Sequence, residues 1–195
     1  MTNFKPLNVT QEAAHRIFVG LGWDPNDSPS LRDKIGALIR KRASHHDLDL
    51  SCFYYDADGK ALGYVTAAPE HYSNATHSIY HSGDDSEGIG DGDDEQISVE
   101  LKNLPDNVYH LVFKASIKSG HNFDEIKEAR VRLCDGYTER VFEDVGIHSD
   151  MNAFVFLHLT KDNGQWRYVR IDRYLNNDTP DKIGDIIAKN VIPLP

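Results

Sequence analysis

The sequence predicts a mainly β protein, an antiparallel β-sandwich with a few short helices. Three observations predict it. Apolar and polar residues alternate with a period of two in several short segments, Asp-, Asn- and Gly-containing turns separate these segments, and helical periodicity is confined to three places. The pattern favours a sandwich over repeated β-α-β units, in which a helix of about 10–15 residues would follow each strand.

The first three strands are expected at 15–21, 48–54 and 61–67. From 47 to 54, apolar residues at the even positions alternate with polar residues at 47, 49 and 51, as in a strand with one buried face. Asp58-Gly59 follows this segment and is a specific signal for a hairpin turn. The segments 48–54 and 61–67 are therefore predicted to pair.

The second half of the chain continues this pattern. The segments 97–101 and 129–133 alternate cleanly, whereas 108–117 is apolar at both parities, as expected for a central strand. Further strands are expected around Phe142 and at 153–159 and 166–171, with turns at 104–107 and 161–164. About nine or ten short strands result, which is enough for two packed sheets.

Three helices are expected. Ser28-Pro29 is a good helix start, and the following segment 30–42 has one apolar stripe opposite a strongly basic face. Residues 122–127 are expected to form one short turn, and 178–190 a C-terminal helix. No internal repeat or long linker is apparent, so residues 1–195 are interpreted as a single domain with 25–46 as an inserted basic helical segment.

The acidity of the chain is local. The net charge is −10, and the segment 81–95 contributes seven negative charges and no Lys or Arg, which leaves −3 for the rest. A net negative charge is unsuited to binding nucleic acid, because Lys and Arg are needed to neutralise its phosphates. No secretory leader and no stretch of about 18 apolar residues is present, so a cytoplasmic protein is expected. Cys52 and Cys134 lie in apolar segments and are expected to be reduced and buried.

Carboxylates at two places in the sequence suggest a metal site. Two carboxylates about 5 Å apart repel by roughly 3 kcal/mol at an effective dielectric near 20, so a folded cluster of acids needs a cation, a proton or bulk water. Acids two apart at the start of a strand share one face, and glycines in the acidic loop allow sharp turns. All-oxygen ligands of this kind suit Ca²⁺. The candidate ligands are Asp47, Asp49, Asp84, Asp91, Asp93, Asp94 and Glu95.

The acidic loop does not match two known calcium motifs. An EF-hand loop begins Asp-x-Asp-x-Asp-Gly. In a loop starting at Asp91, the fifth position is Glu95 and the sixth, where glycine is required, is Gln96, so the pattern fails. The glycine-rich nonapeptide repeat occurs only once, and one copy cannot build a β-roll. Zinc would require His or Cys ligands, of which His81 is a weak candidate. A solvated hairpin tip is the alternative, and a metal site would have to combine the loop with a distant strand.

The order of these motifs resembles that of the TerD family of tellurium-resistance and stress-response proteins. The segments that carry the resemblance are 20–24 (GLGWD), 47–52 (DLDLSC), 55–60 (YDADGK), 81–84 (HSGD), 90–97 (GDGDDEQI), 104–108 (LPDNV) and 123–135. The resemblance implies a β-sandwich that binds two Ca²⁺ ions near one end, in a bacterial cytoplasmic protein. The acids named above are the positions that match the family's acidic motifs. Two segments, 25–46 and 70–80, depart from the family pattern.

Three functional hypotheses follow. The first is a calcium-binding stress-response protein without catalysis. This hypothesis includes protein partners of a stress-response complex and an association of that complex with the membrane. The second is a divalent-metal-dependent phosphoester hydrolase, in which His45, His46, His71, His77 or His81 supplies an acid or base. The third is an interaction module that docks an acidic or membrane partner through the helix at 30–42. No P-loop, Ser-His-Asp order or activated cysteine supports turnover, so the first is favoured and the chain is not expected to be an enzyme.

Overall fold

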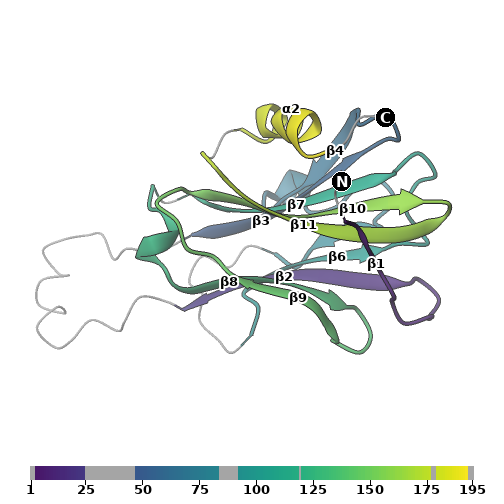
Figure 1. Cartoon of the computed structure of the whole chain (residues 1–195), viewed down its shortest axis with the longest axis horizontal. Coiled ribbons are helices and arrows are strands. Elements are labelled where there is room, and N and C mark those ends of the chain that lie inside the picture. Colours follow the sequence, from purple (N-terminus) through teal and green to yellow (C-terminus); the bar gives the residue numbers. More distant parts are fainter. Residues whose placement is uncertain (1–2, 25–46, 84–91, 119, 177–178, 193–195) are drawn as a thin grey trace, which may run out of the picture.

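The structure, a computed structural model, describes residues 3–24, 47–83, 92–118, 120–176 and 179–192. Within these ranges the chain forms two antiparallel β-sheets that lie face to face (Figure 1). The six-stranded sheet has the order β1-β11-β10-β7-β3-β4, and the five-stranded sheet has the order β5-β6-β2-β8-β9. The predicted sandwich is therefore confirmed.

The strands of the six-stranded sheet are β1 (Lys5–Pro6), β11 (Gln165–Leu175), β10 (Ala153–Asp162), β7 (His110–Ile117), β3 (Leu48–Tyr55) and β4 (Ala61–Val65). Those of the five-stranded sheet are β5 (Ile79–His81), β6 (Glu95–Glu100), β2 (Arg16–Asp24), β8 (Lys127–Asp135) and β9 (Val141–Gly146). Two short 3₁₀ helices, η1 (Pro69–His71) and η2 (Phe123–Glu125), and the α-helix α2 (Pro180–Asn190) complete the described elements.

Most strands lie where the alternation predicts them. β3 and β4 form the expected hairpin, and Gly59 adopts φ 74° in the turn, a conformation that glycine tolerates best. β2 is longer than predicted, because it continues through Gly22 to Asp24. The two-residue β1, the three-residue β5 and the helix η1 have too few residues to give a periodic signal and were not predicted.

The core lies between the two sheets. The even positions of β3, among them Leu48 and Leu50, face the buried side chains of β2 and β6, including Val19 and Ile97. β7 is buried along its whole length, as its two-sided apolar pattern predicts. Its outer face is covered because Ile183 and Ile187 of α2 pack there in a second apolar cluster. The two layers and α2 are visible in Figure 1.

The helix predictions have different outcomes. The predicted turn at 122–127 is η2, which Asn122 caps by accepting a hydrogen bond from the amide of Asp124. The predicted C-terminal helix is α2, which begins at Pro180 and not at 178. The predicted basic helix at 30–42 lies outside the described residues. In the part of the chain that the structure describes, no helix has the length and apolar character needed to span a membrane.

Candidate metal centre at one end of the sandwich

A buried glutamate joins the two sheets where β3 and β6 begin. Glu95 is the first residue of β6 and has no exposed surface. Its Oε2 accepts a hydrogen bond of 2.7 Å from the amide of Leu50 in the opposite sheet. That amide is available because β4 pairs with β3 only from Cys52 onwards, which leaves the edge of β3 open at Leu50. The bond therefore connects two strands that are distant in sequence and belong to different sheets.

The Glu95 carboxylate is only partly satisfied. Its Oε1 has no hydrogen-bond partner among the described residues. Burial raises the pKa of Glu95 to about 7, although His81 and the Leu50 amide lower it, and the nearby Asp49 charge raises it further. His81 Nδ1 accepts a hydrogen bond from the Gly83 amide, so its ring proton is assigned to Nε2, which lies 3.3 Å from Glu95 Oε2. A buried carboxylate with an unsatisfied oxygen is a position where a cation would be favourable.

Asp94 fixes the end of the acidic segment on β2. The Asp94 amide donates to the carbonyl of Leu21, and Asp94 Oδ2 accepts a hydrogen bond of 2.8 Å from the amide of Trp23. Asp94 thus continues the pairing of β6 with β2 beyond Glu95. The orientation of this carboxylate is set by main-chain contacts, as expected for residues at a structured site and not at a solvated loop tip.

Asp93 lies over a glycine of β2. Arg132 Nε of β8 donates to both Asp93 oxygens, at 2.7 and 3.0 Å. A Cβ on Gly20 would lie only 2.0 Å from Asp93 Oδ2, and a Cβ on Gly22 would lie 2.6 Å from the carbonyl oxygen of Gly92. The two glycines of β2 are therefore required where the acidic segment passes close to the sheet.

Asp47 and Asp49 stand at the start of β3. Asp47 is half-buried, and its carbonyl accepts a hydrogen bond from the Lys118 amide. Asp49 is buried, and its Oδ1 lies 2.5 Å from Lys118 Nζ. Beside it, burial lowers the pKa of Lys114 to about 8, while the charge of Asp49 acts in the opposite direction. Asp49 is thus placed between two lysines and the carboxylate of Glu95.

The predicted ligands are brought together only in part. The starts of β3 and β6 meet through the bond between Leu50 and Glu95, with Asp49 nearby. Asp93 and Asp94 are held against β2 by Arg132 and Trp23. Asp84 and Asp91 lie outside the described residues. Over the described ranges alone, no group of three His, Cys, Asp or Glu side chains is positioned to hold one metal ion.

Several residues at this end were not identified from the sequence. Arg132 and Lys118 come from β8 and from the end of β7, and nothing in their local sequence links them to the acids. Gly20 and Gly22 did carry a signal, because glycines inside a strand often mark a close backbone approach. Both cysteines are buried, as predicted, and burial raises the pKa of the Cys134 thiol to about 11.

Comparison with known proteins decides the family. The family model described as the TerD domain matches residues 4–179. The chain belongs to the TerD family. The match begins just before β1 and ends just before α2, so it covers both sheets of this TerD domain.

Relatives of this TerD domain include proteins named for resistance and for stress. The chain is 30% identical over 190 residues to tellurium resistance protein TerZ of Serratia marcescens, with 95% of this chain and 94% of the relative covered. It is 29% identical to general stress protein 16U of Bacillus subtilis, with 85% and 83% covered. The crystal structure of a TerD homologue from Streptomyces coelicolor has the same fold, with a TM-score of 0.68 at 22% identity and 88% and 96% covered.

Proposed function

We propose that this TerD-family chain is a non-catalytic stress-response protein that binds Ca²⁺ at the end of the sandwich where β2 ends and β3 and β6 begin. The observation that carries the proposal is Glu95, a fully buried carboxylate with one oxygen lacking a hydrogen bond, beside a second buried carboxylate, Asp49. Burying two acids together is unfavourable unless positive charge compensates them. Lys118 supplies part of that charge in this structure.

The donor set fits a hard cation. Asp47, Asp49, Asp94 and Glu95 are the described candidates, and Asp84 and Asp91 would add ligands from the acidic loop. Asp93 differs from them, because Arg132 already neutralises both of its oxygens; we assign it to positioning the loop over Gly20. Carboxylate and backbone oxygens suit Ca²⁺, which accepts variable geometry, better than Zn²⁺, which prefers His and Cys. When bound, the ion would supply the charge that the buried acids require.

The histidines near the acids support a binding role more than a catalytic one. His81 Nδ1 accepts a hydrogen bond from the Gly83 amide, and its Nε2 is buried 3.3 Å from Glu95 Oε2. His71 lies against Tyr64, and His77 against Ser73. A general acid or base needs a nitrogen that can reach the substrate, so these contacts favour the calcium-binding protein over the hydrolase.

Titration with calcium tests the proposal. Chelator-stripped protein is titrated calorimetrically with Ca²⁺ and, separately, with Mg²⁺, and its melting temperature is measured with and without each ion. An ion that binds only the native state at a hundredfold excess over its Kd stabilises by about 2.7 kcal/mol, so Ca²⁺ should raise the melting temperature. The same preparation is screened for phosphoester hydrolysis with Mg²⁺ and Mn²⁺, and turnover would favour the hydrolase.

Two glutamate variants localise the effect. Glu95→Gln removes the buried charge, whereas Glu100→Gln makes the same change at the other end of β6, where Glu100 accepts a hydrogen bond from Asn103. Loss of the calcium response in Glu95→Gln only would support the site. Equal responses in both variants, or no calcium response of the unmodified chain, would refute it.

A further inference from the structure

A second group of polar residues lies on the outer face of the six-stranded sheet, beside α2. Asp49 pairs with Ser116 and Ser51 pairs with Lys114 across β3 and β7. Residues that face each other across an antiparallel pair, and residues two apart on one strand, point to the same side of the sheet. These four side chains therefore form one patch on the face opposite to the core.

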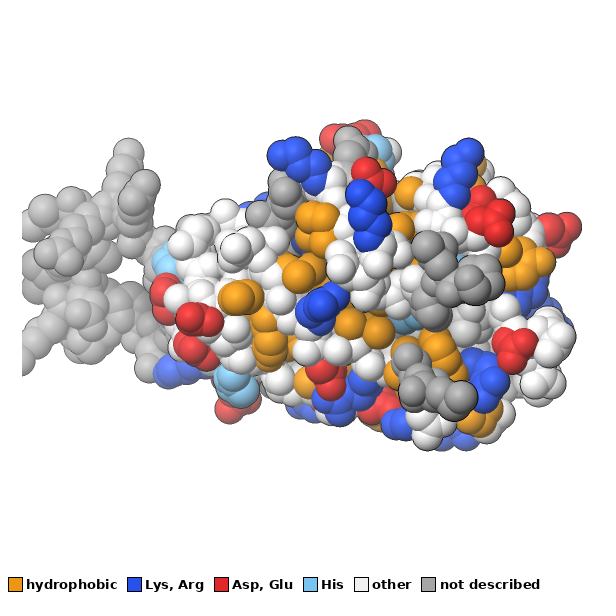
Figure 2. Space-filling view, turned by 45° about the horizontal axis from the view of Figure 1, so that its top comes forward, with side chains coloured by type: hydrophobic (Ala, Val, Ile, Leu, Met, Phe, Trp, Pro, Cys, Tyr) orange, Lys and Arg blue, Asp and Glu red, His pale blue; other side chains and the backbone are white. Residues whose placement is uncertain are grey.

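The patch is the floor of a pocket of about 170 Å³. Thr66 and Ala68, which follow β4, line one side, and Lys118 and Pro180 complete the lining. Pro180 is the first residue of α2, so the N-terminus of an 11-residue helix borders the pocket. The surrounding surface on the α2 side carries both basic and acidic side chains (Figure 2).

Two serine hydroxyls belong to the lining of the pocket. Ser51 is 5% exposed and Ser116 is 4% exposed, and both line the pocket. A serine hydroxyl can both donate and accept, so each of them can bond to an oxygen of a ligand that enters the pocket. Thr66 Oγ1 accepts a hydrogen bond from the Ala68 amide.

The charge of the pocket favours an anion. Among its described lining side chains, Lys114 and Lys118 contribute two positive charges and Asp49 one negative charge, which gives a net charge of +1. Lys114 is only 3% exposed, so its ammonium is poorly screened. The helix N-terminus adds partial positive charge. Asp49 opposes an anion, although Lys118 is already paired with it.

We propose that this pocket binds a phosphate group, presented either by inorganic phosphate or by a small phosphomonoester. Two ammonium groups, two hydroxyls and a helix N-terminus supply donors on several sides, which matches the oxygens of a phosphate. The phosphate pocket adjoins the proposed calcium site, and the two share Asp49 and Lys118.

The experiment uses the full chain in calcium-free buffer. Inorganic phosphate and phosphoserine are titrated calorimetrically at neutral pH, with sodium chloride at equal ionic strength as the reference. We expect saturable binding of at least one of them with a Kd of about 1 mM or tighter. Binding of phosphoserine alone would identify a phosphomonoester as the ligand, and binding of both would identify the phosphate group as sufficient. No heat beyond the chloride reference for either probe would overturn the proposal.

Substitutions place the binding in this pocket. Lys114→Met should weaken phosphate binding by about tenfold or more, while Lys102→Met, which removes an exposed lysine elsewhere, should leave the Kd within about twofold. If Lys114→Met does not fold, the double variant Ser51→Ala with Ser116→Ala decides, and unchanged affinity in it overturns the proposal. Asp49→Asn should tighten phosphate binding but weaken Ca²⁺ binding, so failure of one site is distinguishable from failure of the other.

Discussion

The amide of Leu50 and the carboxylate of Glu95 form a hydrogen bond of 2.7 Å that links the two sheets of the sandwich. Glu95 has no exposed surface, so water cannot replace the bond without rearrangement. The bond fixes the start of β6 relative to the open edge of β3. It also sets the distance between the acidic segment and Asp49, on which the proposed calcium site depends.

Glu95→Ala should therefore destabilise the protein more than Glu95→Gln. Alanine leaves the buried Leu50 amide without an acceptor, which costs about 1–3 kcal/mol in the free energy of unfolding. Glutamine retains an amide oxygen that can accept the same bond. Urea denaturation of both variants in calcium-free buffer checks the prediction, and equal destabilisation would show that the bond contributes little.

Gly20→Ala should be destabilising because its Cβ would overlap the Asp93 carboxylate, only 2.0 Å away. The cost is expected to be about 1–3 kcal/mol, as for other overpacked sites. If the overlap is the cause, Asp93→Ala should relieve most of it. A double-mutant cycle of unfolding free energies measures the coupling, and additive effects would show that another contact makes Gly20 necessary.

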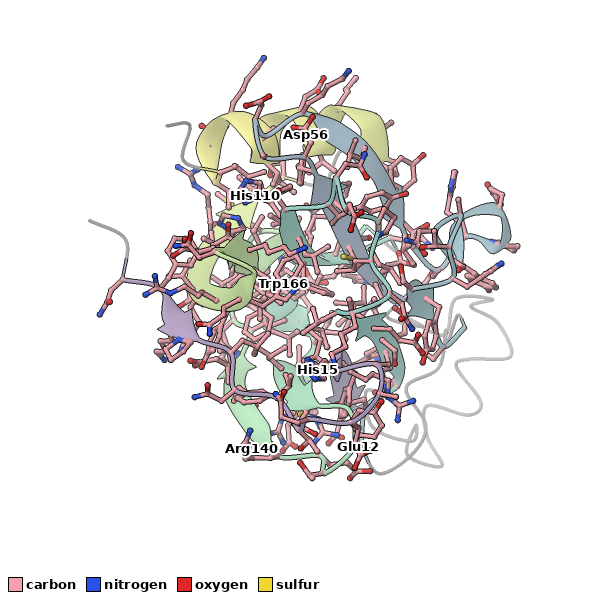
Figure 3. All side chains as sticks on the ribbon, turned by 90° about the vertical axis from the view of Figure 1, so that its right-hand side faces the viewer. Glu12, His15, Asp56, His110, Arg140 and Trp166 are labelled. Carbon is pink, nitrogen blue, oxygen red and sulfur yellow. The ribbon has the colours of Figure 1, made fainter. Side chains whose placement is uncertain are left out.

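Acid should destabilise the fold through a buried histidine pair. His158 Nε2 lies 3.1 Å from His110 Nδ1, and burial, with a smaller contribution from His110, lowers the pKa of His158 from 6.5 to about 3. Figure 3 labels His110 and Asp56, whose charge acts on His110 in the opposite direction to burial. A lowered histidine pKa means that the stabilising contribution is present above pH 6.5 and is lost as the pH falls towards 3.

The expected loss from His158 is about 2 kcal/mol of unfolding free energy between pH 7.5 and pH 5, since one pKa unit corresponds to about 1.4 kcal/mol. Denaturation at several pH values measures it. His158→Leu should reduce the slope. Val155→Ala, a loss of buried volume with no titrating group, should lower stability while keeping the slope. If the unfolding free energy of His158→Leu still falls with pH as steeply as that of the unmodified protein, groups other than His158 cause the acid sensitivity.

Neither cysteine should react with a thiol reagent while the protein is folded. Cys52 and Cys134 are buried, and burial raises the pKa of both thiols, so little thiolate forms at neutral pH. Labelling should appear only on unfolding, at a rate that follows the concentration of denaturant. Rapid labelling of native protein would contradict this and would make thiol chemistry a candidate for the role of the family in tellurium resistance.

The fold was largely predictable because strand periodicity is local. The alternation from 47 to 54 and the turn at Asp58-Gly59 identify the hairpin of β3 and β4 without tertiary information. β2 was predicted to end at 21, three residues before its end in the structure. The structure extends it, since Gly20 and Gly22 are needed for contacts made by a segment about 70 residues away in the chain.

The site was less predictable, because its contacts depend on register between distant strands. The topology explains why acids at the starts of β3 and β6 meet at one end. Arg132 can bind Asp93 because Arg132 pairs with Gly20 across β2 and β8, and no local pattern reveals this pairing. The pocket beside α2 was missed for the same reason, because Ser51 and Lys114 become neighbours only when β3 pairs with β7.

The pairing of β1 with β11 joins Lys5 to Tyr168. One of the first segments to be synthesised therefore cannot pair until one of the last has been synthesised. The six-stranded sheet cannot close until residues 165–175 have left the ribosome, and during translation its apolar inner surface has an incomplete cover. Such non-local pairing slows folding and leaves intermediates with exposed apolar surface, which are prone to aggregate. A nascent chain of this architecture therefore depends on its last strands to complete the sheet that its first strand joins.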